Sequence, residues 1–318
     1  MPIIRTLYWS HLSDYEKCPQ KYLWSYGWGD LDLGRGPGKG KPKPKDKSMH
    51  HAVMGIVIQG VLEDFYNDCL WKHQSGLQDR LVRMTKERLS STLANPRFHV
   101  DWHAAGSYEE LEEVCVSGVL GYLKTMKHHK FLGPYAKSEV ELLGYVNKML
   151  PLGGRADFII RREDSGITML DGKNSKTKMK YTDPDQLRWY ALTFALSFNK
   201  LPDRLGFVWF RYPYEEDTEE TGVDWVDFTR RDLKQLVDRA QQVRKGQRKE
   251  KFDPTPKAKH CNFCDFETIC SPRIEQKKAN SAKRAKKLGL PVIDGSEGAV
   301  EFGFGGIQSI ASKGTKGT

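Results

Sequence analysis

Two aspartates and a lysine near the middle of the chain are the residues best suited to do chemistry. Asp171 and Lys173 lie in LDGKNSK at the end of an apolar run, and Asp157 lies within the apolar stretch GRADFII. Side chains two residues apart on a strand point to the same face, so Asp171 and Lys173 should lie together. If the two apolar stretches form adjacent antiparallel strands, Asp157 should lie beside them.

Two neighbouring carboxylates repel each other, and the pKa of each rises unless a cation lies between them. A hard divalent ion such as Mg²⁺ or Mn²⁺ binds such oxygens. A lysine beside the ion can orient or deprotonate a water and offset the charge that develops on a phosphate. The set therefore predicts metal-assisted hydrolysis of phosphodiester bonds. The alternative is that Asp157 caps a turn and that Asp171 and Lys173 form a surface ion pair.

A group of cysteines is the second set that could do chemistry. Cys261, Cys264 and Cys270 lie within the ten residues of CNFCDFETIC, and Cys18 lies in the early stretch CPQKY. The chain has 6 cysteines in 318 residues, too few for a disulfide scaffold, so we interpret the late three as metal or cluster ligands. Four thiolates suit an iron–sulfur cluster or Zn²⁺, and the spacing alone does not separate the two.

Periodicity predicts the elements that position these residues. Helical spacing of apolar residues predicts helices over 1–30, 49–73, 182–198 and 229–243, with further helical pattern to about residue 132. Strand patterns cover 138–146, 154–162, 166–173 and 204–212. Asp183 and Pro184 should begin one helix, and Thr229 with Asp232 should form a capping box at another. This order predicts an α/β fold with a mixed sheet flanked by helices.

The charge of the chain favours a polyanionic partner. It has 51 basic and 41 acidic residues, a net charge of +10, and the excess concentrates at 34–47 and 273–287. Nucleic acid is the commonest such partner, and a generally basic surface is the alternative. We expect no membrane association, because no apolar run approaches the ~18 residues of a membrane span. The N-terminus lacks the apolar core of a signal peptide, so we expect an intracellular protein.

The ordered motifs SHLSDYEKCPQKYLW, GIVIQGVLE, SEVEL, GRADFI, LDGKNSK, DPDQLRWYAL and CNFCDFETIC resemble a known family. They are similar to the RecB-like branch of the PD-(D/E)xK nucleases that carries an iron–sulfur cluster. This branch includes CRISPR-associated spacer-trimming nucleases and AddB-type nuclease domains. The resemblance covers about residues 8–271 and implies a restriction-endonuclease-like fold.

The resemblance also implies roles for individual residues. Asp157, Asp171 and the carbonyl of Gly172 would bind the metal ion, and Lys173 would be the catalytic lysine. Gln186 and Tyr190 match a Q-x3-Y helix motif, and Glu139 matches a frequent glutamate on the preceding strand. The [4Fe–4S] ligands would be Cys18, Cys261, Cys264 and Cys270.

One position departs from the family pattern. The family places a histidine ligand on the early helix, where this chain has Gln59, a weaker neutral ligand. Glu63 lies one turn later on the same helix face and would compensate for the weaker metal binding of Gln59. The lysines that follow the active-site strand are the expected DNA contacts: Lys176, Lys178 and Lys180.

Composition, periodicity and the resemblance together predict six segments: 1–33, an N-terminal helix with the first cluster cysteine; 34–47, a flexible basic loop; 48–135, a helical region; 136–250, the nuclease core; 251–272, the cluster segment; and 273–318, a basic tail with little fixed structure.

The expected function is that of a metal-dependent DNA exonuclease acting on single strands or DNA ends, in recombination, repair or CRISPR or phage DNA processing. Its expected place is the cytoplasm of a bacterial or phage-infected cell. The chain has no phosphate-binding G-x4-GK-[ST] motif, so unwinding would need a separate helicase. Partners in recombination or CRISPR adaptation are also expected. The alternatives are a DNA-binding adaptor on an inactive nuclease fold and a zinc-stapled nucleic-acid-binding module.

Overall fold

A computed structural model describes the chain at residues 6–27, 49–73, 75–162, 164, 166–178, 182–262 and 264–287. It divides into two compact units, Met1–Cys270 and Ser271–Thr318. The boundary falls inside the predicted cluster segment 251–272. The predicted basic loop 34–47 lies outside the described residues.

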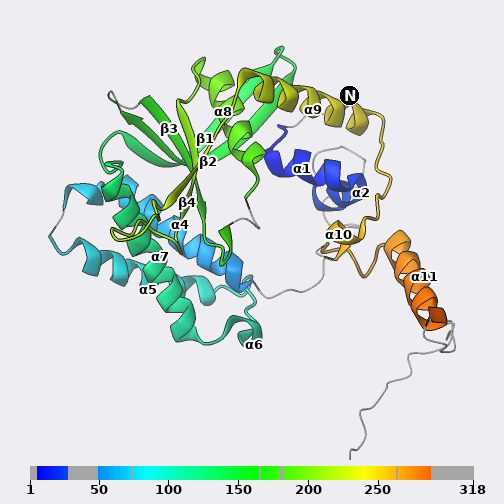
Figure 1. Ribbon diagram of the computed structural model, residues 1–318, viewed down its shortest axis with the longest axis horizontal. Coiled ribbons are helices and arrows are strands. Elements are labelled where there is room, and N and C mark those ends of the chain that lie inside the picture. Colours follow the sequence, from blue (N-terminus) through cyan, green and yellow to red (C-terminus); the bar gives the residue numbers. More distant parts are fainter. Residues whose placement is uncertain are drawn as a thin grey trace, which may run out of the picture. The chain divides into compact units, whose positions relative to one another are not determined.

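A five-stranded sheet in the order β1-β2-β3-β4-β5 forms the centre of the first unit (Figure 1). Its neighbours pair antiparallel except for β3 and β4, which are parallel. This confirms the predicted α/β fold with a mixed sheet. The strands are β1 Ala136–Val146, β2 Leu150–Arg162, β3 Gly166–Lys173, β4 Arg204–Trp209 and β5 Val223–Val226.

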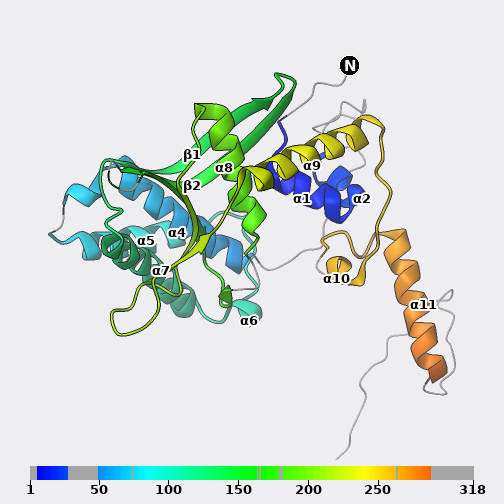
Figure 2. The same ribbon diagram turned by 45° about the horizontal axis from the view of Figure 1, so that its top comes forward.

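Helices cover both faces of the sheet, and each face has its own apolar cluster (Figures 1 and 2). One cluster joins the sheet to α4 His50–Asn67, α5 Leu77–Leu93 and α7 Tyr108–His128. The other joins it to α1 Trp9–Lys17, α8 Pro184–Phe198 and α9 Arg230–Arg248. Shorter elements are α2 Pro19–Tyr22, η1 Leu23–Gly27, η2 Leu70–Lys72, α6 Trp102–Ala105 and α10 Ala258–Cys261. No described helix is long and apolar enough to cross a membrane.

Local capping fixes where the two helices behind the sheet begin. The Asp183 side chain accepts a hydrogen bond from the backbone of Asp185, and Pro184 is the first residue of α8. Thr229 and Asp232 exchange side-chain and backbone hydrogen bonds in a capping box at α9. Both caps confirm the predicted helix starts, because these side chains satisfy backbone N–H groups that have no partner in the first turn.

The hairpin of β1 and β2 extends past the end of β3. Our strand prediction began at residue 154, whereas β2 begins at Leu150. The additional length pairs with the N-terminal segment: Leu7 N–H donates to Pro151 O at 2.9 Å, and Gly153 N–H donates to Leu7 O at 2.9 Å. A Cβ atom at Gly153 would lie only 2.7 Å from a ring carbon of Tyr8.

Strand β1 lies at the edge of the sheet, and α8 covers part of its outer backbone. The Ser197 hydroxyl accepts a hydrogen bond from Leu143 N at 3.1 Å and lies 2.9 Å from Leu143 O. One side chain thus contacts both backbone polar groups of an edge residue, which would otherwise face water.

The second unit differs from our expectation of little fixed structure after residue 272. Helix α11 spans Ser271–Lys287, and the remaining residues 288–318 lie outside the described part. Its sequence is rich in Ala, Lys and Arg, which are strong helix formers whatever their charge.

Candidate active site

Asp171 lies near the C-terminal end of β3 and is 2% exposed. A buried carboxylate needs partners. Gln186 Nε2 donates to its Oδ1 at 3.0 Å, and Lys173 Nζ lies 2.5 Å from its Oδ2. Lys173 Nζ also donates to Gln186 Oε1 at 3.1 Å. The three side chains therefore form a closed set of contacts between β3 and α8.

Asp157 lies on the neighbouring strand β2, and its Oδ2 joins the sheet to the opposite helix layer. This oxygen accepts hydrogen bonds from Gly172 N at 2.7 Å and from Gln59 Nε2 at 3.2 Å. Gln59 belongs to α4, on the other side of the sheet from Gln186 in α8. The two carboxylates are thus held from both helix layers.

The electrostatics of this pair are unbalanced. Burial holds the pKa of Asp157 well above its usual value, and the charge of Asp171 adds to the shift despite the opposing effects of the Gly172 N–H and Lys173. Burial also raises the pKa of Asp171, against the lowering effect of Lys173. The Oδ2 of Asp171 has no hydrogen bond of regular geometry among the described residues. A single lysine does not compensate the buried Asp171 and the partly buried Asp157, so the site favours a further cation.

Glu139 and Glu63 contribute further negative charge. Burial raises the pKa of Glu139; Arg155 lowers it, while Glu63 and Asp171 raise it. Glu139 forms an ion pair with Arg155, and it has a left-handed backbone with φ of 52°. Such a conformation is strained for a residue other than glycine and is commonest at functional sites. Arg155 has no predicted role from the sequence; its position two residues before Asp157 on the same strand was the available signal.

Tyr190 lies one turn after Gln186 on α8. Its hydroxyl accepts a hydrogen bond from Gln186 Nε2 at 3.0 Å, and burial raises its pKa. Gly154 of β2 allows this approach, since a Cβ atom there would lie 3.1 Å from Tyr190 Cδ1. The predicted helix-face pair thus lies beside the carboxylates.

The three lysines expected to contact DNA differ in their surroundings. Lys176 is exposed. Lys178 forms an ion pair with Glu220, and its Nζ lies 5.3 Å from the centre of the Tyr212 ring. Lys180 lies outside the described residues. The pairing of Lys178 with Glu220 was not predictable from the local sequence, because the two residues are far apart along the chain.

The structure brings the first cysteine close to one of the late three. Cys18 separates α1 from α2. Burial raises the pKa of the Cys264 thiol, and the nearby Cys18 raises it further, while the charge of Lys21 lowers it. Cys264 N–H donates to Cys261 O at 3.1 Å. All four predicted ligands, Cys270 included, are partly buried and form no disulfide.

Within the described ranges, no three His, Cys, Asp or Glu side chains converge tightly enough to hold a metal ion. The donor chemistry fits nonetheless. The site offers carboxylate and amide oxygens with excess negative charge, as a hard divalent ion requires. Cys18 and Cys264 offer soft sulfur at a different place, as a cluster or zinc requires.

Comparison with known proteins gives one family. A family model described as the PD-(D/E)XK nuclease superfamily matches residues 8–271. No curated protein is significantly similar to the chain. A solved structure titled "Crystal structure of SSO0001" aligns with 52% of this chain and 78% of its own, at 19% identity and a TM-score of 0.29. At that TM-score the likeness carries no argument.

Proposed function

The chain belongs to the PD-(D/E)XK nuclease superfamily, and from this premise we propose that it is a metal-dependent DNA exonuclease with Asp157, Asp171 and Lys173 at its active site. Membership alone indicates a metal-dependent nuclease. One observation carries the assignment of the site: the closed contacts of Asp171, Lys173 and Gln186 lie beside an Asp157 held by the Gly172 N–H.

The proposed metal ligands are the Asp157 and Asp171 carboxylates and the Gly172 carbonyl, with Gln59 and Glu63 as further oxygens nearby. When bound, Mg²⁺ or Mn²⁺ would act as a Lewis acid that polarises the scissile phosphate and lowers the pKa of a water. The raised pKa of both aspartates supports this, because a cation would relieve their repulsion.

Lys173 is the proposed group that orients the attacking water and offsets charge on the phosphate. Its position is fixed by Asp171 at 2.5 Å and Gln186 at 3.1 Å, so its ammonium need not reorganise during the reaction. Tyr190 supports Gln186 through a hydrogen bond at 3.0 Å. Gln186 and Tyr190 are therefore proposed as positioning residues.

DNA is the proposed substrate, as single strands or as ends, in recombination, repair or CRISPR or phage DNA processing. The net charge of +10 supports a phosphate-rich substrate. A separate helicase or a recombination or CRISPR adaptation protein is the proposed partner. The exposed Lys176, close after β3, is the proposed backbone contact.

We further propose that Cys18, Cys261, Cys264 and Cys270 ligate a [4Fe–4S] cluster, with Zn²⁺ as the alternative. The electrostatic coupling of Cys18 to Cys264 supports a shared site. Such a site would join the two ends of the first unit, where closing a long loop should stabilise most in theory.

A DNA-binding adaptor on an inactive nuclease fold is the second candidate. Gln59 favours it, because a neutral amide hydrogen-bonded to Asp157 stands where the family pattern has a histidine ligand.

The test is cleavage of end-labelled single-stranded DNA with Mg²⁺ or Mn²⁺ by protein purified without oxygen. Lys173→Ala is the test variant, and Lys234→Ala, an exposed lysine on α9, is the matched control. Metal-dependent cleavage by the wild type and the control, lost in Lys173→Ala, is the expected result. DNA binding without cleavage by any of the three proteins would reject the enzyme in favour of the adaptor.

A further inference from the structure

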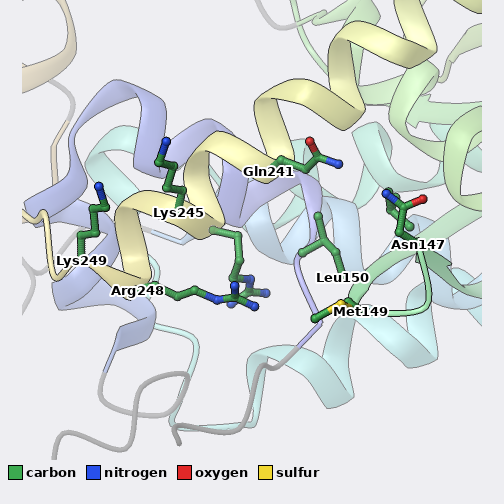
Figure 3. A pocket seen from close by; sticks show the side chains of 9 residues that line it. Asn147, Met149, Leu150, Gln241, Lys245, Arg248 and Lys249 are labelled. Atoms are coloured by element: carbon green, nitrogen blue, oxygen red, sulfur yellow. The ribbon is translucent and has the colours of Figure 1, made fainter.

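A pocket distant from the carboxylates lies between the β1–β2 turn and the last turns of α9 (Figure 3). Its volume is about 430 Å³. The turn contributes apolar and amide groups, and the helix contributes mainly cationic side chains. The residues that line it are Val146, Asn147, Met149, Leu150, Gln241, Arg244, Lys245, Arg248 and Lys249.

The charge of the pocket has a single sign. Four of the lining residues are basic and none is acidic. Among the described residues, no carboxylate forms an ion pair with Lys245, Arg248 or Lys249. Arg239, earlier on the same helix, is by contrast paired with both Glu16 and Asp185. Lys245, Arg248 and Lys249 thus have no described acidic partner that would compete with an external anion.

The helix dipole explains only part of this arrangement. Basic residues near a helix C-terminus are favourable in themselves. That effect accounts for exposed lysines, but not for Arg244, which is 7% exposed and lines the pocket. A guanidinium in buried surroundings acts on the cavity with less screening than an exposed ammonium does, and its planar donors match a phosphate.

The opposite wall suits a nucleotide. Asn147 and Lys148 both have left-handed backbones, with φ of 50° and 57°, and form the tight turn of the hairpin. Met149, 69% exposed, follows them. The amide of Asn147 and the apolar side chains of Met149 and Leu150 thus line the cavity opposite α9, which contributes Gln241 and the cations (Figure 3).

The pocket and the catalytic carboxylates are linked by a single strand. Leu150 lines the pocket and Asp157 lies further along β2, so a strand rise of about 3.3 Å per residue places them about 23 Å apart. We propose that this pocket binds a backbone phosphate of the DNA strand whose scissile bond lies at Asp157 and Asp171. This inference rests on the proposed function and adds a second, distant contact with the substrate.

The experiment compares wild type, Lys245→Ala/Arg248→Ala and the control Lys234→Ala. Binding of fluorescent oligo(dT) is measured by anisotropy with Ca²⁺ in place of Mg²⁺ over a range of salt concentrations. Each cation contributes about 0.7 to the slope of log affinity against log salt for a single strand, so the double variant should lose about 1.4. If the two cations contribute nothing at about 1 M salt, the double variant should bind about 25-fold more weakly than wild type at about 0.1 M salt, because the slopes differ by about 1.4 over this tenfold range of salt.

A second readout separates the pocket from the catalytic site. Hydrolysis of bis(p-nitrophenyl) phosphate with Mn²⁺ needs only the catalytic residues, whereas DNA cleavage needs both sites. The ratio of DNA cleavage to small-substrate hydrolysis should fall in the double variant and not in Lys234→Ala.

The outcomes distinguish the two proposals. Equal affinity and salt slope in the double variant and the control, with DNA cleavage intact, would overturn the pocket and leave the nuclease. Pocket-dependent DNA binding without hydrolysis of either substrate would overturn the nuclease and keep the pocket as a DNA contact. No DNA binding by the wild type would overturn both.

Discussion

Replacement of Gln186 by alanine tests whether the contacts between β3 and α8 prepare the site for catalysis. The amide of Gln186 donates to Asp171 at 3.0 Å and accepts from Lys173 at 3.1 Å. Gln186→Ala removes both contacts without removing either charged group. The side chain is only partly buried, and alanine is the stronger helix former, so the fold should persist.

The expected loss follows from the two contacts. A hydrogen bond to a charged group contributes about 1.5–3 kcal/mol. The loss should be smaller than the sum of the two bonds, because Lys173 and Asp171 stay paired with each other when the amide is gone. We expect a loss of about 2–4 kcal/mol of transition-state stabilisation, which is a fall of about 30- to 900-fold in kcat. Tyr190→Phe removes one neutral hydrogen bond of about 0.5–1.5 kcal/mol and should cost about 2- to 13-fold.

The assay is steady-state cleavage of labelled single-stranded DNA, with kcat and KM measured separately across pH. A positioning role predicts that the loss appears in kcat, with KM little changed. It also predicts that Gln186→Ala adds little to Lys173→Ala in a double-mutant cycle. A fall of less than about threefold in kcat for Gln186→Ala, with Lys173→Ala inactive, would refute the reasoning.

Three further predictions concern stability and metal content. Without added divalent ions, native Asp157 holds its proton to higher pH than the unfolded chain, so the native state binds more protons and the free energy of unfolding falls as pH rises from about 4. Asp157→Asn should reduce that fall and raise Tm at neutral pH, measured by thermal denaturation at several pH values; an unchanged pH dependence would contradict it. Gly172→Ala would place a Cβ atom 2.4 Å from the ring of Phe210, so urea denaturation should show a loss of about 1–3 kcal/mol, and full stability would show that the ring moves freely. Cys18→Ser should lose most of the bound iron or zinc and lower Tm, checked by elemental analysis and calorimetry; undiminished metal content would place the metal elsewhere.

Strand β3, which carries Asp171 and Lys173, was the most predictable part of the chain. The sequence placed it at 166–173, and β3 spans Gly166–Lys173. Apolar alternation and a turn glycine act locally here, so a local pattern is enough. The pairing of Asp171 with Lys173 followed from the two-residue period of a strand.

Features that depend on distant partners were not predictable. The start of β2 was missed because Pro151 and Gly153 are typical of turns; in the structure they pair with Leu7, which lies far away along the chain. The short edge strand β5 was also missed, since its four residues give too little periodicity. The hydrogen bond of Gln59 to Asp157 joins two layers, and only the motif order pointed to it.

The contact of Ser197 with Leu143 has a consequence for behaviour at high concentration. An edge strand with free N–H and C=O groups can pair with the same strand of another molecule, and β1 carries the exposed side chains of Leu143 and Tyr145, 51% and 54% exposed. The Ser197 hydroxyl contacts both backbone groups of Leu143, at 3.1 Å and 2.9 Å, and so interrupts the row of free backbone groups beside these exposed side chains. A serine on a helix should thus disfavour intermolecular strand addition, and the aggregation that follows from it, at this edge of the described sheet.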